Sequence, residues 1–486
     1  MTGGLFTDFY ELTMAQGYWK SGERPAAVFE YFFRRHPFAG GYSVFAGLET
    51  LLAGLETFRF SPEDLAWLES LGGFERGFLD HLADFRFSGD IHAVQEGSIV
   101  FPHEPLLRVR ADLVEAQLIE GLLLNTLNFQ SLVATKAARV WRATNFGSVM
   151  EFGLRRAQGP DGALSASRAA YLGGAASTSN SLAGRLLGIP VSGTMAHSWV
   201  MSFATELESF ERYAELYPDR TVFLIDTYDT LGSGIANAIT AGGRLVKAGR
   251  NFGVRLDSGD IDYLSREVRA ALDAAGLRSA YIVVSNELDE NIIEHLVSAG
   301  APVDFWGVGT NLVTGGSESS FTGVYKLAAI ERGGRLEPTM KVSDTPEKST
   351  TPGLKELWRL HGEGGRAAAD LLTLGDEEPR AGQTLVLHHH SGDWRCAEIE
   401  PEGIERLLRP VMLGGKRVAA APELAGIRGG LRSRLEAFDG TYLRVLNPHV
   451  YKVSISPRLR ELKLGLIERG LREHRHPSGQ AHPGQH

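Results

Sequence analysis

From about residue 136 onward, short apolar runs alternate with longer stretches in which apolar and polar positions repeat at helical spacing. The runs have the length and β-branched content of buried strands, whereas the longer stretches have one apolar face. Regular alternation of this kind predicts parallel strands covered by helices. The expected strands end within 149–152, 189–191, 222–226, 254–257, 281–285, 303–306 and 324–327, and the expected helices cover 178–187, 200–217, 235–241, 261–275 and 290–299.

This alternation fits a closed β/α barrel better than an open sheet, which is the alternative, because no Gly-x-Gly-x-x-Gly follows the first strand. The predicted fold class is therefore α/β, with residues 136–343 as the β/α barrel domain. Residues 1–135 form an N-terminal α+β domain, and its expected elements are a helix at 7–19 capped by Thr7 or Asp8, a strand at 26–33, helices at 48–58, 62–71 and 111–127, and short antiparallel strands at 90–110.

Residues 344–486 form a C-terminal extension that we expect to pack on the N-terminal domain. Its stretches 354–372 and 403–471 mix helical patterning with glycine turns. The tail 472–486 is polar and rich in Gly, Pro and His, which predicts disorder. The triplet His388–His390 has no carboxylate at ligand spacing, so a solvated loop is favoured over a metal site.

Composition narrows the setting and the partners. The 486 residues are enough for two or three domains, and the net charge of -9 argues against a general nucleic-acid surface. With Cys396 as the single cysteine, no intramolecular disulfide can form, and a reducing compartment is expected. Neither a leader sequence nor a long charge-free apolar stretch is found. We therefore expect a soluble, cytoplasmic protein that binds neither nucleic acid nor membranes.

Polar residues gather directly after the expected strands. In β/α barrels these ends converge on one cavity that holds the active site. Short glycine loops after the late strands can present backbone N–H groups to phosphate, although each could also be a plain turn. The polar residues are Arg155, Arg156, Thr194, His197, Asp226, Asp229, Arg255, Asp257, Ser258, Asp260 and Asn286, and the candidate phosphate-binding loops contain Gly307, Gly309, Thr310 and Gly323.

Arg255 and Asp257 lie two residues apart on one strand, so their side chains project to the same side. Such a pair suits a ribose phosphate, since the carboxylate can accept sugar hydroxyls or bind Mg²⁺ while the guanidinium holds phosphate oxygens. An internal salt bridge is the alternative. His197 by itself could be an ordinary loop or cap histidine, and only its polar neighbours favour a functional role.

The chain resembles the nicotinate phosphoribosyltransferases, most clearly up to about residue 360. The motifs that carry the resemblance are TDFYELTM (7–14), EFGLRR (151–156), TSN (178–180), GTMAHS (193–198), LIDTYDT (224–230), RLDSGD (255–260) and GVYKL (323–327). The resemblance implies an irregular β/α barrel of the type II phosphoribosyltransferase kind, in a homodimer with shared active sites. It also implies transfer of phosphoribose from phosphoribosyl pyrophosphate to nicotinate, which yields nicotinate mononucleotide and pyrophosphate in NAD salvage.

The resemblance further implies that ATP hydrolysis is coupled to transfer through a phosphohistidine, with Mg²⁺ present. His197 matches the phosphorylated position, and Asp226 matches a carboxylate that would orient the imidazole from its other nitrogen. No Walker-type Gly-x-x-x-x-Gly-Lys-Ser/Thr occurs, so ATP binding rests on the resemblance alone. Asp257 completes the implied catalytic set.

Two aromatic rings would stack on the pyridine: Phe152 below it and Tyr10 of the neighbouring subunit above it. Arg155, with Thr178, Ser179, Asn180 and Thr194, would recognise the carboxylate, and Arg255 would bind the sugar phosphate. Phosphate contacts are implied for Arg34, Lys341 and Lys348.

No acidic residue occurs in 178–181, where nicotinamide-specific relatives carry an aspartate. This difference favours the acid over the amide as substrate. A nicotinamide phosphoribosyltransferase and a non-catalytic barrel that binds sugar phosphates remain the alternatives.

Overall fold

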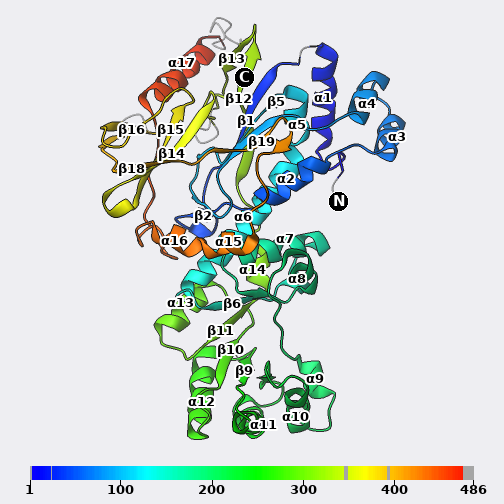
Figure 1. Cartoon of the computed structure of the whole chain (residues 1–486), viewed down its shortest axis with the longest axis vertical. Coiled ribbons are helices and arrows are strands. Elements are labelled where there is room, and N and C mark those ends of the chain that lie inside the picture. The colour runs from blue at the N-terminus through cyan, green and yellow to red at the C-terminus, as the bar shows by residue number, and fades with distance from the viewer. Residues whose placement is uncertain (1–2, 23, 344–348, 391–394, 474–486) are drawn as a thin grey trace, which may run out of the picture. The chain divides into compact units, whose positions relative to one another are not determined.

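The computed structural model describes residues 3–22, 24–343, 349–390 and 395–473 (Figure 1). Contacts divide the chain into two compact units. We call residues 1–128, 322–421 and 432–486 the terminal unit, and residues 129–321 and 422–431 the central unit. Lys348 and residues 474–486, most of the tail expected to be disordered, lie outside the described residues.

The central unit contains a sheet of six parallel strands, an irregular and incomplete β/α barrel. Its strands are nearly continuous apolar runs because both faces are covered, and Val254, Ile282 and Val308 are fully buried. β7 and β8 are the two edges of this sheet. The sheet is therefore a half-barrel, whereas a closed barrel was expected. In spatial order the strands are β7 (Ser177–Thr178), β6 (Ser148–Glu151), β11 (Phe305–Val308), β10 (Tyr281–Val284), β9 (Gly253–Leu256) and β8 (Val222–Leu224).

Helices separate these strands along the chain (Figure 1). Several begin at a side-chain cap, including Asp260 before α12 and Asp289 before α13. The helices are α7 (Gly159–Leu172), α8 (Ser181–Leu187), α9 (His197–Met201), α10 (Glu206–Leu216), α11 (Ile235–Lys247), α12 (Ile261–Ala274), α13 (Glu290–Ser298), α14 (Thr310–Thr314) and α15 (Leu424–Gly429).

Three expectations for the strand and helix series were wrong. The strand expected at 189–191 is reduced to a single bridge between Thr178 and Val191, since Pro190 has no N–H to donate to a ladder. The helix expected at 200–217 is two helices, α9 and α10. The last expected strand is part of β12 (Gly323–Arg332), which pairs antiparallel with β1 (Ala26–Phe33) in the terminal unit.

The terminal unit is built on a seven-stranded antiparallel sheet in the order β13-β12-β1-β5-β3-β19-β20. The strand expected at 26–33 is confirmed as β1. The other strands are β3 (Asp90–Ala93), β5 (Leu107–Asp112), β13 (Arg335–Pro338), β19 (Arg409–Leu413) and β20 (Lys416–Arg417), and β2 (Ser43–Val44) pairs separately with β4 (Ile99–Val100). The helices are α1 (Phe9–Ser21), α2 (Leu48–Thr57), α3 (Pro62–Leu71), α4 (Arg76–Ala83), α5 (Leu113–Leu118) and the start of α6 (Glu120–Ala143).

A second six-stranded sheet occupies the C-terminal part of the terminal unit, where helical patterning was expected. For 354–372 that expectation was wrong, and the strands there bury charged residues in pairs: Lys355 contacts Glu30 at 2.7 Å and Arg359 contacts Asp370 at 2.6 Å, whereas 403–471 contains helices as well as strands. In the sequence, these charged positions were therefore interpreted as the solvent-exposed face of a helix. The strands, in spatial order, are β17 (Cys396–Ile399), β16 (Leu385–His389), β21 (Val453–Ile455), β15 (Ala367–Leu374), β14 (Lys355–His361) and β18 (Gly403–Arg406), with helices α16 (Leu431–Glu436) and α17 (Pro457–Glu473).

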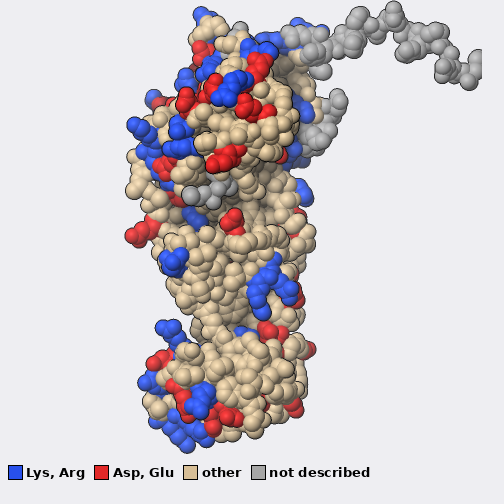
Figure 2. Space-filling view, turned by 90° about the vertical axis from the view of Figure 1, so that its right-hand side faces the viewer, with Lys and Arg blue, Asp and Glu red and all other residues tan. Residues whose placement is uncertain are grey.

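Two further features of the structure are the distribution of charged side chains on the surface and the character of the helices. On the face drawn in Figure 2, basic and acidic side chains are interspersed. Among the described residues, none of the helices combines the length and the apolar character that crossing a membrane would require.

Candidate functional site

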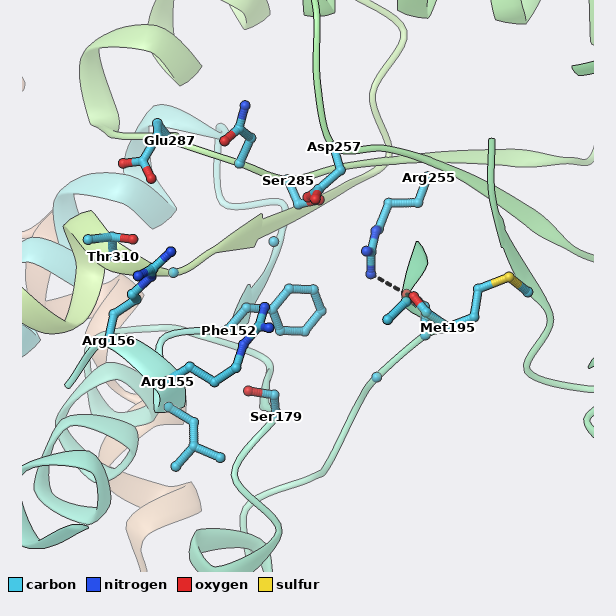
Figure 3. Close-up of a pocket in the computed structure, with 17 residues that line it drawn as sticks. Phe152, Arg155, Arg156, Ser179, Met195, Arg255, Asp257, Ser285, Glu287 and Thr310 are labelled. Atoms are coloured by element: carbon cyan, nitrogen blue, oxygen red, sulfur yellow. Dashed lines mark hydrogen bonds between the residues drawn. The ribbon is translucent and has the colours of Figure 1, made fainter. Parts of the chain in front are cut away.

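A cavity of about 430 Å³ lies at the carboxyl ends of the central-unit strands (Figure 3). Loops that follow β6, β7, β9, β10 and β11 contribute to it, as expected for the face of a β/α barrel that carries function. Its walls are formed by Phe152, Leu154, Arg155, Arg156, Ser179, Gly193, Thr194, Met195, Ala196, Arg255, Asp257, Ser285, Asn286, Glu287, Gly307, Gly309 and Thr310.

The loop after β6 places an aromatic ring and a cation in this cavity. Phe152 donates its backbone N–H to the Val308 carbonyl at 2.9 Å, which fixes the loop to the neighbouring strand β11. In Figure 3 the Phe152 ring lies between the side chains of Arg155 and Arg255. A Cβ atom at Gly307 would stand 2.7 Å from the ring, so only glycine leaves room for it. The ring and Arg155 can thus serve one flat anionic ligand.

The end of β9 supplies a second cation beside a carboxylate. Arg255 donates from Nη1 to the Thr194 hydroxyl, while its buried Nε has no hydrogen-bond partner. Burial lowers the pKa of Arg255, an effect that Asp257 and Asp226 oppose. Asp257 accepts a hydrogen bond from the Ser285 hydroxyl on one oxygen. Both side chains keep unused polar capacity toward the cavity.

His197 is the first residue of α9 and stands beside this pair. Its Nδ1 is 3.1 Å from the Thr227 hydroxyl, and its Nε2 is 3.9 Å from Asp257 Oδ2. The imidazole is 42% exposed and the Asp257 side chain 34% exposed, so solvent or a ligand can reach both. The structure therefore brings the histidine and the sugar-phosphate pair together.

Asp226 does not form the expected hydrogen bond with the imidazole. Its Oδ2 accepts from the Asp257 backbone N–H at 3.1 Å and from the Ser258 hydroxyl at 2.6 Å, and its buried Oδ1 has no partner. The hydroxyl of Thr227, rather than the carboxylate of Asp226, lies within hydrogen-bond distance of His197 Nδ1. The sequence offered no signal for Thr227 beyond its place next to Asp226.

The segment 178–180 divides between the cavity and the interior. Ser179 lines the cavity. The side chains of Thr178 and Asn180 are turned inward: Thr178 contacts Glu151 at 2.5 Å, and Asn180 caps α8 by accepting from Leu182 N at 3.1 Å. Glu151, which is 1% exposed, was not singled out from the sequence because a carboxylate inside a strand gives no sign of its partners.

Gly307, Gly309 and Thr310 line the cavity as expected, whereas Tyr10, Arg34, Gly323 and Lys341 belong to the terminal unit. Tyr10 is 50% exposed on α1. Arg34 and Lys341 lie in loops, where their backbone N–H groups bond to threonine hydroxyls. A Cβ atom at Gly323 would lie 2.0 Å from Asn128 Oδ1, so this glycine serves close packing within its own unit.

Some lining residues were not selected as site residues from the sequence, among them Leu154, Met195 and Glu287. Asn286 has φ +100°, a backbone conformation that residues other than glycine rarely adopt. Such strained conformations are common at functional sites. The signal available for Asn286 was its position directly after β10.

The donor atoms suit a cation that is shared with a ligand. Within the described parts of the chain, no group of three or more His, Cys, Asp or Glu residues could hold a metal ion alone. Asp226 and Asp257 are adjacent, and the buried Oδ1 of Asp226 is unsatisfied. Magnesium is commonly held by one or two carboxylates plus substrate phosphates, so these residues fit it.

Three family models match the chain, and all three describe nicotinate phosphoribosyltransferases. Residues 5–128 match the nicotinate phosphoribosyltransferase N-terminal domain, residues 148–364 the nicotinate phosphoribosyltransferase family, and residues 354–463 the nicotinate phosphoribosyltransferase C-terminal domain. The nicotinate phosphoribosyltransferase of Bacillus subtilis is 40% identical over 93% of this chain and 92% of its own length.

The human nicotinate phosphoribosyltransferase is 37% identical over 94% of this chain and 95% of its own length. A crystal structure of human nicotinic acid phosphoribosyltransferase superposes with a TM-score of 0.84 at 34% identity, covering 95% of this chain and 99% of the other. The structure of nicotinate-nucleotide pyrophosphorylase from Pyrococcus furiosus superposes with a TM-score of 0.70 at 23% identity, covering 89% of this chain and 95% of the other, and shows a shared fold.

Proposed function

Because the chain belongs to the nicotinate phosphoribosyltransferase family, we propose that it transfers 5-phosphoribose from phosphoribosyl pyrophosphate to nicotinate and couples this transfer to ATP hydrolysis. The products of transfer would be nicotinate mononucleotide and pyrophosphate, in NAD salvage. The observation that carries the proposal is the cavity in which Phe152 and Arg155 stand across from Arg255 and Asp257.

The side of the cavity at Phe152 suits a pyridine ring that bears a carboxylate. The Phe152 ring can stack on a flat heteroaromatic ring, and the Arg155 guanidinium can bind the carboxylate. Ser179 adds a neutral hydroxyl, and the cavity has no acidic side chain from the 178–181 segment. A carboxylate there would repel nicotinate and bind an amide N–H, so this composition favours the acid.

The opposite side suits the phosphoribosyl donor. Arg255 can bind phosphate oxygens, and Asp257 can accept ribose hydroxyls. The backbone at Gly307 and Gly309 can approach a phosphate closely because these residues have no side chain. Positive charge that develops on the ribose carbon as pyrophosphate leaves would be stabilised by the nearby carboxylates.

His197 would carry the coupling to ATP. Neutral imidazole attacks the γ-phosphorus of ATP through a nitrogen lone pair, ADP leaves, and water later cleaves the P–N bond to release phosphate. With the Thr227 hydroxyl accepting a hydrogen bond from Nδ1–H, the Nε2 lone pair remains on the side of Asp257. Asp226 and Asp257 would hold Mg²⁺, which neutralises phosphate charge when it is bound.

The proposed assembly is a homodimer. Phe9 and Tyr10 on α1 are 54% and 50% exposed, and Phe9 packs edge-on against Phe74, so the Tyr10 ring is accessible to a second subunit. In the dimer, Tyr10 of one subunit would cover the pyridine ring in its partner's site. The single cysteine, Cys396, is exposed and fits the reducing cytoplasm, where we place the enzyme.

The test supplies purified protein with phosphoribosyl pyrophosphate and either nicotinate or nicotinamide, with and without Mg-ATP, and measures mononucleotide and pyrophosphate by chromatography. We expect nicotinate mononucleotide, faster with ATP, and phosphate on His197 by mass spectrometry. Turnover of nicotinamide alone would establish the amide-specific alternative. Binding of phosphoribosyl pyrophosphate without turnover of either acceptor would indicate a non-catalytic protein.

A further inference from the structure

Glu151, the last residue of β6, is buried directly beneath the cavity wall and receives hydrogen bonds from two sides. Its Oε1 accepts the backbone N–H of Gly153. Its Oε2 accepts the Thr178 hydroxyl at 2.5 Å and lies 2.9 Å from the Ser167 hydroxyl. A single carboxylate therefore connects the loop after β6, the end of β7 and helix α7.

A second layer of hydrogen bonds completes this network. The Asn180 backbone N–H donates to Thr178 Oγ1 at 3.0 Å, and Asn180 Nδ2 donates to Ser167 Oγ at 3.2 Å. Asn180 Oδ1 is used at the start of α8. The polar side-chain atoms of Thr178 and Asn180 are thus occupied inside the protein, and Ser179 between them is held facing the cavity.

Glu151 is buried without a counter-charge, unlike Glu290 in the same unit. Glu290 is also 1% exposed, but Lys136 and Arg139 contact it at 2.6 and 2.9 Å. Among the described residues, neither a lysine nor an arginine forms an ion pair with Glu151. A buried carboxylate without a cation is costly, so an arrangement that retains one needs a purpose beyond stability.

Two of the three structures that Glu151 connects, the loop after β6 and the end of β7, belong to the side of the cavity at Phe152. The Gly153 N–H lies between Phe152 and Arg155 in sequence, and Thr178 precedes Ser179. A Cβ atom at Gly153 would stand 2.2 Å from Val313, so this loop has little room to shift. The side of the cavity with Arg255 and Asp257 is held by other bonds, from Arg255 to Thr194 and from Ser285 to Asp257.

We infer that Glu151 is a positioning residue that sets the distance between the Phe152–Arg155 loop and Ser179, and thereby the affinity and orientation of the pyridine acid. The inference rests on the proposed function and adds to it a residue that does not touch substrate. Thr178 and Asn180, expected to contact nicotinate, act through Glu151 instead. Donor binding at Arg255 does not depend on the network.

The test is Glu151→Gln, which keeps the shape but places an N–H₂ group against one of the donors. A misplacement of about 1 Å can cost about 100-fold in rate, so we expect the nicotinate KM to rise by about 10- to 100-fold. The KM for phosphoribosyl pyrophosphate should stay close to that of the unaltered protein. Thr178→Val, which removes one donor, should raise the nicotinate KM less, and Thr178→Ser should restore it.

Glu206→Gln is the matched control. Glu206 is 7% exposed in the same unit, accepts from Asn237 Nδ2 at 2.8 Å, and does not line the cavity. It should leave the nicotinate KM unchanged. Calorimetric titration of nicotinate into each variant, together with the thermal midpoint, separates weaker binding from weaker folding.

The inference is overturned if Glu151→Gln leaves the nicotinate KM unaltered, or if both KM values and the thermal midpoint shift together, since that pattern marks a merely structural residue. Should Glu151→Gln fail to fold, the comparison of Thr178→Val with Thr178→Ser decides, and equal nicotinate KM values reject the inference. If the unaltered protein makes no nicotinate mononucleotide, the proposed function fails first. The two failures are therefore distinguishable.

Discussion

A buried ion pair of the terminal unit differs from the charged groups around the cavity of the central unit in how fully its polar atoms are paired. In the terminal unit, Arg359 is 8% and Asp370 0% exposed in a bidentate pair, and Tyr451 donates to the same carboxylate at 3.0 Å. In the central unit, Arg255, Asp226 and Asp257 sit at strand ends, with Arg255 Nε and Asp226 Oδ1 unsatisfied. Saturated pairs hold a fold together, whereas buried polar atoms without partners close to a cavity are typical of functional sites.

The largest expected effect tests the terminal unit. Arg359→Met should lower the free energy of unfolding by about 3–5 kcal/mol, because it leaves Asp370 and Glu104 buried without their cation. Burial and the neighbouring Asp370 already raise the pKa of Glu104 well above its usual value. Chemical denaturation measures the loss, and the kcat of the remaining folded protein should be unchanged. A stable but inactive Arg359→Met variant would contradict the division of roles.

In the central unit, Asp257→Asn should lower the catalytic rate and leave the stability of the fold nearly unchanged, the reverse of Arg359→Met. Removing one preorganised group that stabilises transition-state charge costs about 100- to 1000-fold in kcat, and we expect a loss of that size. The side chain is 34% exposed, so the thermal midpoint should shift little. Steady-state kinetics and calorimetry on the same preparation check both statements. Asp262→Asn, on the exposed face of α12, is the control and should behave as the unaltered protein.

His197→Ala separates coupling from transfer at the cavity. We expect the ratio of rates with and without ATP to fall to about one, because the nucleophile for phosphate is gone, while slow ATP-independent transfer persists. Thr227→Val should reduce the ATP stimulation partially, and Thr227→Ser should preserve it, since the contact to Nδ1 needs only a hydroxyl. Complete loss of substrate binding in His197→Ala would instead show that the histidine is structural.

The smallest expected effect concerns Glu11 on α1, a carboxylate that forms no ion pair with any lysine or arginine in the described part of the terminal unit. Desolvation by burial raises its pKa from 4.5 to about 7, despite the hydrogen bond from Thr7. The folded protein therefore holds this proton more tightly than the unfolded chain, so the stabilisation is present below pH 4.5 and is lost as pH rises through about 7. Discounted for solvent screening, the loss is about 1–2 kcal/mol.

Thermal midpoints across pH 5 to 8 measure this effect, and Glu11→Gln should flatten the slope. A slope of the same size in the Glu11→Gln variant would assign it to other groups. Asp64→Asn, at the start of α3 in the same unit, is the control and should keep the slope of the unaltered protein, because Asp64 is already engaged by the Ser61 N–H in a capping box.

Local patterns were reliable where one physical signal dominated. β1 at Ala26–Phe33 and α3 at Pro62–Leu71 occupy the expected residues, since aromatic strand formers define the first and a Ser-Pro start defines the second. The C-terminal sheet was missed because Lys355 and Arg359 are buried against opposite charges, on Glu30 and Asp370. A pattern of polar positions cannot reveal whether a charge meets water or an opposite charge.

The sequence by itself determined the alternation of strands and helices, the placement of Arg255 and Asp257 at the end of a strand, and the family resemblance, because each depends on neighbours in the chain. Only the tertiary structure decided that Thr227 and not Asp226 meets the imidazole, and that Thr178 and Asn180 bind Glu151 and leave Ser179 to the cavity. Hydrogen bonds are short and directional, so which of several adjacent polar side chains makes one depends on how separate strands and loops are packed together.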